Sequence, residues 1–327
     1  MAATMRAIRL LRHGGPEVLA AETLPLPEPG PGEIRIRVEA AGVNFIDTYH
    51  RSGLYPLDPP CGIGLEAAGI VDAVGPGVTG WTPGMRAGGF LGPVGAYAEY
   101  WVVPAARAVR LPEGLDCKTA AAIMLKAATV EYLVCRCAPV KPGMTVLFHA
   151  GAGGVGHLAL PWLKALGATV ITTVGSHEKA ALARARGADH VILYREEPVA
   201  ARVREITGGG GVDVVFDGVG AATWRDSLAS LRRRGMLVSF GNASGPVPPV
   251  SLLELTAAGS VFVTRPSLMD YYAEREEIAD GAARVFAMWE RGVIRPQIAA
   301  RLPLEKAAEA HRLLESRATT GSVILVP

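Results

Sequence analysis

Glycines at positions 151, 153 and 156 have a spacing that can hold a dinucleotide. One glycine allows a tight turn, one lets a pyrophosphate approach the backbone, and one permits close packing of the next helix against the preceding strand. The phosphates then bind N–H groups at the start of that helix. A glycine-rich turn can also be purely structural. Because this one follows an apolar run and precedes a helical one, we predict a nucleotide site.

The segment ITTVGSHEK (171–179) predicts which dinucleotide binds. In an NAD site, an acidic residue at the end of the second strand accepts a hydrogen bond from the ribose 2′-hydroxyl. Residues 171–176 contain no acid, whereas Ser176 and Lys179 offer a hydroxyl and an ammonium. A carboxylate about 4 Å from a 2′-phosphate would cost on the order of 4 kcal/mol, so its absence favours NADPH. Tyr194, at the end of the third predicted strand, would flank the adenine or the phosphate.

Other interpretations of these side chains stay open. Ser176 could simply cap a helix at 177–186, and Lys179 could be an ordinary solvated lysine. Glu178 could bind the ribose and restore NAD binding, although an acid at this position also complements the positive amino end of a helix.

The elements that must position these residues alternate regularly from about residue 119. Short apolar strands separated by amphipathic helices indicate a doubly wound parallel sheet of the Rossmann type, covered on both faces. We expect strands at 144–149, 168–173, 190–193, 212–216, 236–240 and 261–264, and helices at 155–166, 177–186, 199–206, 222–231 and 251–258.

The first 110 residues have a different texture. Proline, glycine and short β-branched runs indicate a compact and largely antiparallel β-domain. The tail continues with a helix at 270–290, a helix at 304–315 and a strand at 321–326, and we expect it to rejoin this first domain. We therefore predict a catalytic domain at 1–127 and 266–327 and a nucleotide-binding domain at 128–265.

Composition excludes several classes of function. The 327 residues carry a net charge of +2 with no basic cluster, which argues against binding to nucleic acid. No apolar run could span a membrane, and the N-terminus lacks the features of a secretory signal, so we expect a cytoplasmic protein. The four cysteines form neither a disulfide pattern nor a zinc quartet, and we predict no metal.

Several motifs resemble one family. GVNFIDTYHRSGLYP (42–56), FHAGAGGVG (148–156), VSFGNASG (238–245), VTRPSL (263–268) and ESRATTG (315–321) are similar to NADPH:quinone oxidoreductases. These form the zinc-independent branch of the medium-chain dehydrogenase/reductase superfamily. The resemblance spans essentially the whole chain and implies a GroES-like β-rich catalytic domain, a Rossmann domain of six strands, NADPH as cofactor and a homodimer.

The resemblance also implies roles for individual residues. Catalytic roles fall on Asn44, Tyr49, Thr129 and Arg265. Around the cofactor it places Asn44, Thr129, Tyr132, Gly151, Gly153, Gly154, Val155, Gly156, Gly175, Ser176, Lys179, Tyr194, Phe240, Asn242 and Arg317.

Zinc-dependent relatives have a cysteine near Asn44 and a Gly-His-Glu motif near Gly64-Leu65-Glu66. Asn44 and Leu65 replace the thiolate and imidazole ligands, so the resemblance also implies that no metal is bound.

Quinone reduction is the activity we expect. A quinone is already electrophilic and mainly needs a nicotinamide held against one face, so we expect hydride transfer in an apolar cleft between the domains. Asn44 and Tyr49 would donate hydrogen bonds to the developing oxyanion. Asn44 could instead satisfy backbone groups in a turn, and Tyr49 could be a core aromatic. Asp47, which lies between them, fits an orienting or structural role.

Two alternative functions remain open. One is NADPH-dependent reduction of an activated C=C bond, in an enone or 2-alkenal. The other is a non-catalytic NADPH-binding protein. The apolar edge SVFVTRP (260–266) favours pairing through Rossmann-domain edge strands in a homodimer.

Overall fold

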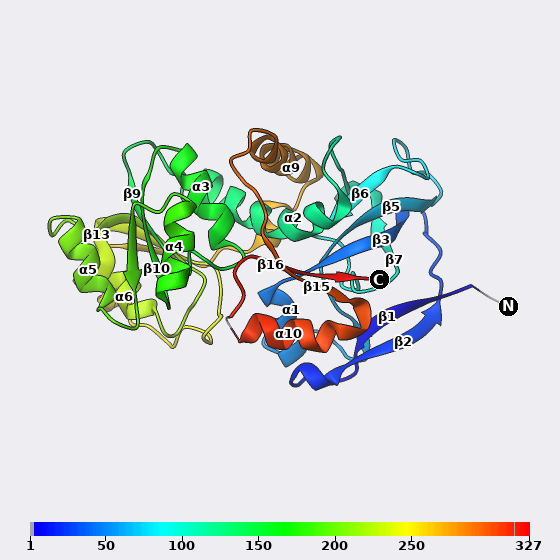
Figure 1. The fold of residues 1–327 in the computed structure, drawn as a ribbon, viewed down its shortest axis with the longest axis horizontal. Helices are drawn as coiled ribbons and strands as arrows, with labels where there is room; N and C mark the ends of the chain where they lie inside the picture. The colour runs from blue at the N-terminus through cyan, green and yellow to red at the C-terminus, as the bar shows by residue number, and fades with distance from the viewer. Residues whose placement is uncertain (1–2, 317) are drawn as a thin grey trace. The chain divides into compact units, whose positions relative to one another are not determined.

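The computed structural model describes residues 3–316 and 318–327 (Figure 1). The chain divides into two compact units. Unit 1 comprises Met1–Ala128, Tyr272–Phe286 and Pro296–Pro327, and unit 2 comprises Thr129–Tyr271 and Ala287–Arg295.

Unit 1 is built on two β-sheets. The strands of the larger sheet pair in the order β15-β16-β3-β5-β6-β8, with β7 also on β3, and the smaller sheet has the order β2-β1-β4. These pairs are antiparallel except for β15 with β16. The strand bounds are β1 Thr4–Leu10, β2 Leu19–Pro25, β3 Glu33–Val43, β4 Cys61–Gly62, β5 Glu66–Val74, β6 Arg86–Gly89, β7 Tyr100–Pro104, β8 Val109–Arg110, β15 Ile298–Pro303 and β16 Ser322–Val326.

The pairing of β3 with β5 determines where the polar residues of unit 1 meet. Its register sets Gly42 opposite Glu66, so the residues that follow β3 lie beside the start of β5. A Cβ at Gly42 would lie 2.1 Å from Glu66 Oε2, which excludes any side chain at this position. Ile34, Ile36 and Val43 on β3 are fully buried in the core of this sheet.

Unit 2 contains the predicted Rossmann sheet. Its six strands are all parallel in the order β11-β10-β9-β12-β13-β14, so the prediction of fold class is confirmed. The strands are β9 Thr145–Phe148, β10 Thr169–Val174, β11 His190–Leu193, β12 Val212–Asp217, β13 Leu231–Ser239 and β14 Phe262–Thr264. The connecting helices are α3 Gly156–Ala165, α4 His177–Ala185, α5 Val199–Ile206, α6 Trp224–Ser230 and α7 Leu252–Ala257. Leu147, Ile171, Val215 and Leu237 of the four central strands are fully buried.

The remaining helices are α1 Phe45–Ser52, α2 Cys117–Glu131, α8 Leu268–Tyr271, α9 Arg275–Glu290 and α10 Ala307–Glu315. A π-helical segment, η3 (Tyr132–Cys137), continues α2, and short 3-10 helices occur at η1 Pro16–Val18, η2 Ala105–Arg107 and η4 Leu304–Lys306. Within the described part of the chain, no helix has the length and hydropathy needed to cross a bilayer.

The structure corrects the sequence-based elements at the tail. The predicted helix at 270–290 is two helices, α8 and α9. Tyr272, between them, is fully buried, packs edge-on against Phe90 and donates a hydrogen bond from its hydroxyl to the Ala128 carbonyl at 3.2 Å. These tertiary contacts interrupt the helix. Strand β15 was not predicted, and α10 begins at residue 307 rather than 304 because η4 precedes it.

Candidate functional site

The glycine turn of unit 2 joins β9 to α3. A Cβ at Gly151 would lie 2.2 Å from Thr172 Oγ1, and one at Gly156 would lie 2.4 Å from the Ala150 carbonyl oxygen. Side chains are therefore excluded at both positions. At Gly153 the nearest atom would be 3.2 Å away, so this face of the turn is more open. Gly151 and Gly156 thus allow the tight turn and the close packing, and Gly153 leaves room for a ligand to approach.

The amino end of α3 is suited to an anion. The helix begins after Val155, which provides no side-chain cap, and Gly154 precedes it in the same turn. N–H groups at an uncapped helix start are the usual partners of a phosphate. The geometry of residues 151–156 fits a pyrophosphate.

A second set of polar groups lies at the carboxyl ends of β10 and β11. Ser176 caps α4 by accepting a hydrogen bond from Lys179 N at 3.3 Å, so the capping alternative is correct for its oxygen. The hydroxyl hydrogen can still be donated to a ligand. A Cβ at Gly175 would lie 2.7 Å from the Tyr194 hydroxyl and 3.4 Å from Arg195 Nε. The ends of the two strands therefore converge here.

Arg195 is a residue that our sequence analysis missed. Burial lowers the pKa of Lys179, and the Arg195 guanidinium lowers it further, while Glu178 acts in the opposite direction as a smaller effect. Two cations close enough to influence each other could together bind a phosphate dianion. The available signal was the position of Arg195 directly after Tyr194, at the end of the third strand.

The segments that follow β13 and β14 contribute three further predicted residues, Phe240, Asn242 and Arg265. Arg265 Nη1 donates to the Ser239 carbonyl at 2.9 Å, and its Nη2 donates to the Asn242 side-chain oxygen at 3.1 Å. The ring of Phe240 packs against Gly218. A Cβ added at Gly218 would lie 2.8 Å from Phe240 Cζ. Through its hydrogen bonds to Ser239 and Asn242, Arg265 therefore connects the segment after β14 to the segment after β13.

Three predicted residues lie elsewhere in the chain. Tyr132 is 2% exposed and stacks on Tyr271 with ring centroids 4.8 Å apart, and Thr129, in α2, is also buried. Arg317 lies outside the described residues.

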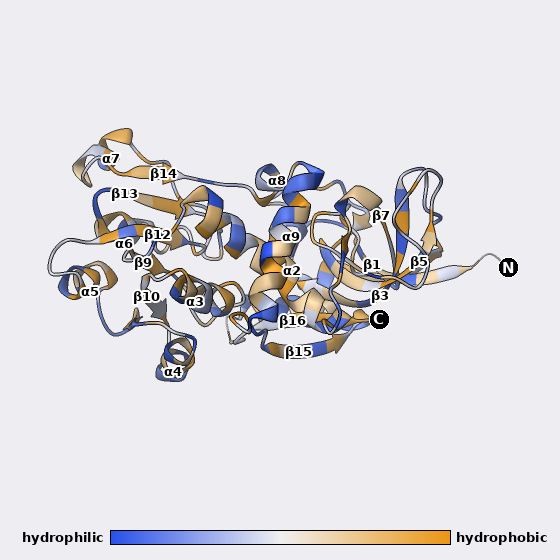
Figure 2. Cartoon of the chain, turned by 90° about the horizontal axis from the view of Figure 1, so that it is seen from above, coloured by the Kyte–Doolittle hydropathy of each residue, from blue (hydrophilic) through white to orange (hydrophobic). Residues whose placement is uncertain are grey.

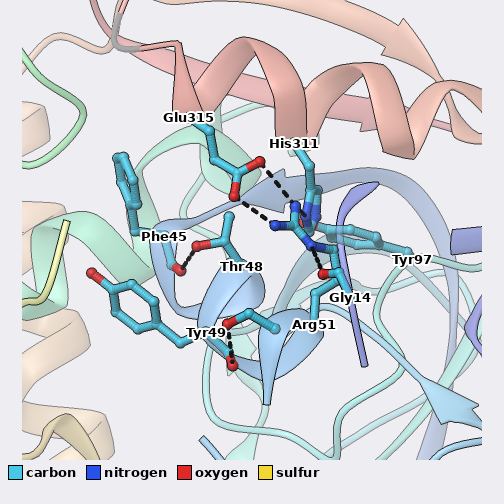
Figure 3. Close-up of polar contacts among 9 residues, drawn as sticks. Gly14, Phe45, Thr48, Tyr49, Arg51, Tyr97, His311 and Glu315 are labelled. Carbon is cyan, nitrogen blue, oxygen red and sulfur yellow. Dashed lines mark hydrogen bonds and ion pairs between the residues drawn. The ribbon is translucent and has the colours of Figure 1, made fainter. Parts of the chain in front are cut away.

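The predicted residues of unit 1 lie on α1. Asn44 caps this helix: its backbone N–H donates to Asp47 Oδ2 at 2.8 Å, and its Nδ2 donates to Glu66 Oε2 at 2.8 Å. Tyr49 is 9% exposed and packs edge-on against Tyr55 at 5.2 Å. In Figure 3, its side chain leaves α1 on the side away from Tyr97.

Glu66 anchors Asn44 and is completely buried. Its Oε1 accepts a hydrogen bond from Leu125 N at 2.7 Å, and its Oε2 lies 3.6 Å from Lys126 Nζ. Burial raises the pKa of Glu66, whereas Lys126 and the Asn44 amide lower it. This carboxylate fixes the orientation of the Asn44 side chain.

Asp47, for which the sequence favoured an orienting or structural role, belongs to a second buried polar group. The Tyr97 hydroxyl donates to Asp47 Oδ2 at 2.7 Å and lies 3.4 Å from His311 Nε2. Burial raises the pKa of Asp47 to about 7, against the lowering effect of the Tyr97 and Asn44 hydrogen bonds.

The same group reaches the C-terminal helix α10. Arg51 Nη1 lies 3.2 Å from His311 Nδ1, and its Nη2 lies 2.5 Å from Glu315 Oε1 (Figure 3). Burial and the Arg51 guanidinium lower the pKa of His311 to about 3, so the ring is neutral near pH 7. Arg51, Tyr97 and His311 could not be associated from the sequence because they lie far apart along the chain.

Potential metal ligands are not clustered. Across residues 3–316 and 318–327, no group of three or more His, Cys, Asp or Glu side chains could hold a metal ion.

A dinucleotide turn on a six-stranded parallel sheet, joined to a β-rich unit, defines a nucleotide-dependent oxidoreductase of the medium-chain type. Family models support both parts: "Alcohol dehydrogenase GroES-like domain" matches residues 30–113 and "Zinc-binding dehydrogenase" matches residues 154–280. The chain belongs to the quinone oxidoreductase family of the medium-chain dehydrogenase/reductase superfamily.

Similar proteins cover nearly the full length of the chain. A quinone oxidoreductase of Pseudomonas aeruginosa is 49% identical, over 98% of this chain and 99% of its own. A 2-haloacrylate reductase of Burkholderia sp is 45% identical, over 97% of each chain. The solved structure of Escherichia coli quinone oxidoreductase complexed with NADPH is 47% identical, covering 98% of this chain and 100% of its own, with a TM-score of 0.97.

Proposed function

We propose that this protein reduces quinones with NADPH and without a metal. The observation that carries the cofactor preference is the group formed by Ser176, Lys179 and Arg195 at the ends of β10 and β11. The relatives named quinone oxidoreductase support the substrate class. When bound, NADPH supplies the hydride, and the protein supplies its orientation.

The residues we assign to NADPH follow the geometry of unit 2. The turn from Gly151 to Gly156 would hold the pyrophosphate, and the three polar side chains would hold the 2′-phosphate. Tyr194 would lie against the adenine. To the remainder of the cofactor we assign Asn44, Thr129, Tyr132, Gly175, Phe240, Asn242 and Arg317.

The residues we assign to the quinone are fewer. Asn44, with its amide oriented by Glu66, and Tyr49 would donate hydrogen bonds to the oxygen on which charge develops. Thr129 and Arg265 complete the proposed catalytic set. We place the catalytic domain at 1–127 and 266–327 and the NADPH domain at 128–265. This division differs from the compact units at residues 128, 266–271 and 287–295.

A second candidate function is reduction of an activated C=C bond. It is favoured by the 45% identity to a protein named 2-haloacrylate reductase. The same hydride donor and oxyanion donors would suit a conjugated carbonyl compound.

One comparison tests these functions. NADPH oxidation is measured with 1,4-benzoquinone, with an enone, and with neither, before and after dialysis against a chelator. We expect the quinone to be reduced fastest and the chelator to have no effect. Faster reduction of the enone would replace the proposed substrate class, and lost activity after chelation would reject the metal-free mechanism.

We also propose a cytoplasmic homodimer. β14 is the last strand of its sheet (Figure 2). Phe262, on this strand, is 59% exposed. Leu252 and Leu253 of the α7 segment are 79% and 78% exposed. An apolar edge of this kind is normally covered by a partner. Light scattering should give a dimer for the wild type and for Leu54→Glu, which alters unit 1, but a monomer for Phe262→Glu.

A further inference from the structure

A group of buried polar side chains lies beneath the glycine turn, and neither the fold nor the proposed chemistry accounts for it. His149 follows β9, Thr173 is on β10, Asp217 ends β12, and Ser227 is on α6. All four are at most 3% exposed. β10, β9 and β12 are neighbours in the sheet, so these side chains connect the carboxyl ends of three strands.

The hydrogen bonds of this group have a determined direction. Asp217 Oδ2 accepts from the Ser227 hydroxyl at 2.6 Å, so the hydrogen of that hydroxyl is already used. His149 Nε2 lies 3.0 Å from Ser227 Oγ and must therefore carry a hydrogen and donate it.

The neutral imidazole then accepts at its other nitrogen. His149 Nδ1 lies 3.0 Å from Thr173 Oγ1, so the threonine hydroxyl donates to it. Burial lowers the pKa of His149, while Asp217 and Asp226 act in the opposite direction. Thr173 Oγ1 is finally left to accept the Ala150 N–H at 3.3 Å.

One end of this chain of hydrogen bonds lies on the backbone of the glycine turn, and the other end lies on the loop that follows β12. Ala150 opens the glycine turn with a φ of 57°, a left-handed conformation that costs free energy in any residue with a side chain. At the other end, Asp217 Oδ1 accepts from Val219 N at 2.8 Å and Gly220 N at 3.1 Å. The chain thus holds the turn after β9 and the loop after β12 together.

We propose that this one-way chain of hydrogen bonds, from Ala150 N–H to the Asp217 carboxylate, positions the glycine turn for the NADPH pyrophosphate. Thr173, His149 and Ser227 are positioning residues, because they hold the backbone of the turn from beneath. This inference rests on the proposed cofactor site.

A nucleophilic triad is the other arrangement these residue types could form. In such a triad the base lies between the acid and the hydroxyl, and the hydroxyl is accessible to substrate. Here Ser227 lies between His149 and Asp217, donates its hydrogen to the acid, and is 0% exposed. The order His149, Ser227, Asp217 therefore fits a chain of structural hydrogen bonds and does not fit a nucleophilic triad.

The test compares two threonines of β10. Thr173→Val removes one link of the chain, and Thr173→Ser keeps the hydroxyl. Thr169→Val is the matched control, because Thr169 begins the same strand, at the end away from the glycine turn, and takes no part in the chain. We expect Thr173→Val to raise the Kd of NADPH by about 5- to 10-fold in a fluorescence titration. The other two variants should stay within about 2-fold of the wild type.

Two readouts decide the outcome. An unchanged Kd in Thr173→Val, or an equal rise in Thr169→Val, would overturn the inference. Nitrogen-15 NMR of the wild type, assigned by comparison with His149→Gln, should show a neutral Nε2–H ring from pH 6 to 8. An Nδ1–H ring or an imidazolium would overturn it even if Thr173→Val failed to fold. If the wild type itself did not bind NADPH, the proposed cofactor site would be rejected instead.

Discussion

Asp217 of unit 2 and Asp47 of unit 1 are both buried carboxylates, but their surroundings differ. Asp217 accepts hydrogen bonds on both oxygens, from two backbone N–H groups and from the hydroxyls of Thr223 and Ser227. Asp47 accepts two hydrogen bonds on Oδ2, whereas its Oδ1 has no hydrogen-bond partner among the residues described.

The difference separates a scaffold from a group that can titrate. Both carboxylate oxygens of Asp217 accept hydrogen bonds, and those from Val219 N and Gly220 N hold the loop after β12 in one conformation. With one oxygen unpartnered, burial dominates at Asp47 and raises its pKa to about 7. Unit 2 therefore holds its loops with fully used hydrogen bonds, whereas unit 1 contains a carboxyl group that changes protonation near neutral pH.

Removing the scaffold carboxylate should have the largest effect. Asp217→Ala would leave two backbone N–H groups and two hydroxyls without their buried acceptor, at a cost of about 3–5 kcal/mol in the free energy of unfolding. Urea unfolding measures this cost. Asp226→Ala, on α6 beside Ser227, should change the free energy of unfolding by less than about 1 kcal/mol. Equal losses of unfolding free energy in Asp217→Ala and Asp226→Ala would show that the hydrogen bonds of Asp217 have no special role in stability.

Asp47 should make the stability of the protein depend on pH. Its folded pKa of about 7 is above the usual value of 3.8, so the folded state holds the proton more tightly than the unfolded state. The resulting stability is present below about pH 4, is lost as pH rises to about 7, and is constant above that. Between pH 5 and 8 the wild type should lose about 2–3 kcal/mol relative to Asp47→Asn, measured by urea unfolding. Parallel pH profiles would contradict this.

Changing Lys179, the cation that we propose for the 2′-phosphate, should separate the affinities for NADPH and NADH. Lys179→Ala should weaken NADPH binding by about 10- to 100-fold, because a charge-assisted hydrogen bond contributes roughly 1.5–3 kcal/mol. NADH affinity should hardly change. Fluorescence titration with each cofactor measures both, and Lys141→Ala, an exposed lysine of the same unit, is the control. A similar loss for both cofactors would mean that Lys179 acts on the fold alone.

A change at Tyr49 in unit 1 should lower turnover and leave the affinity for NADPH unchanged. Tyr49→Phe should lower kcat for 1,4-benzoquinone by about 10-fold, since one hydrogen bond to the developing oxyanion is lost. The Kd of NADPH should stay the same. Tyr100→Phe, at a partly exposed tyrosine on β7, should leave both constants unchanged. Unaltered turnover in Tyr49→Phe would remove this residue from the proposed mechanism.

What the sequence alone determined was local. The glycines at 151 and 156, the missing acid at 171–176 and the alternation of strands and helices depend on neighbouring residues and on periodicity. They were sufficient to predict the Rossmann sheet, which the structure confirms. The break between α8 and α9 was not predictable, because it depends on the contacts of Tyr272 with residues 90 and 128.

The tertiary structure decided which distant side chains meet and how deeply they are buried. Arg195 approaches Lys179 because β10 and β11 are paired, and Thr173 reaches His149 because β10 lies beside β9. Tyr97 meets Asp47 and His311 only in the folded unit. Their chemistry follows from desolvation and hydrogen bonding, which depend on the three-dimensional environment and leave no local pattern in the sequence.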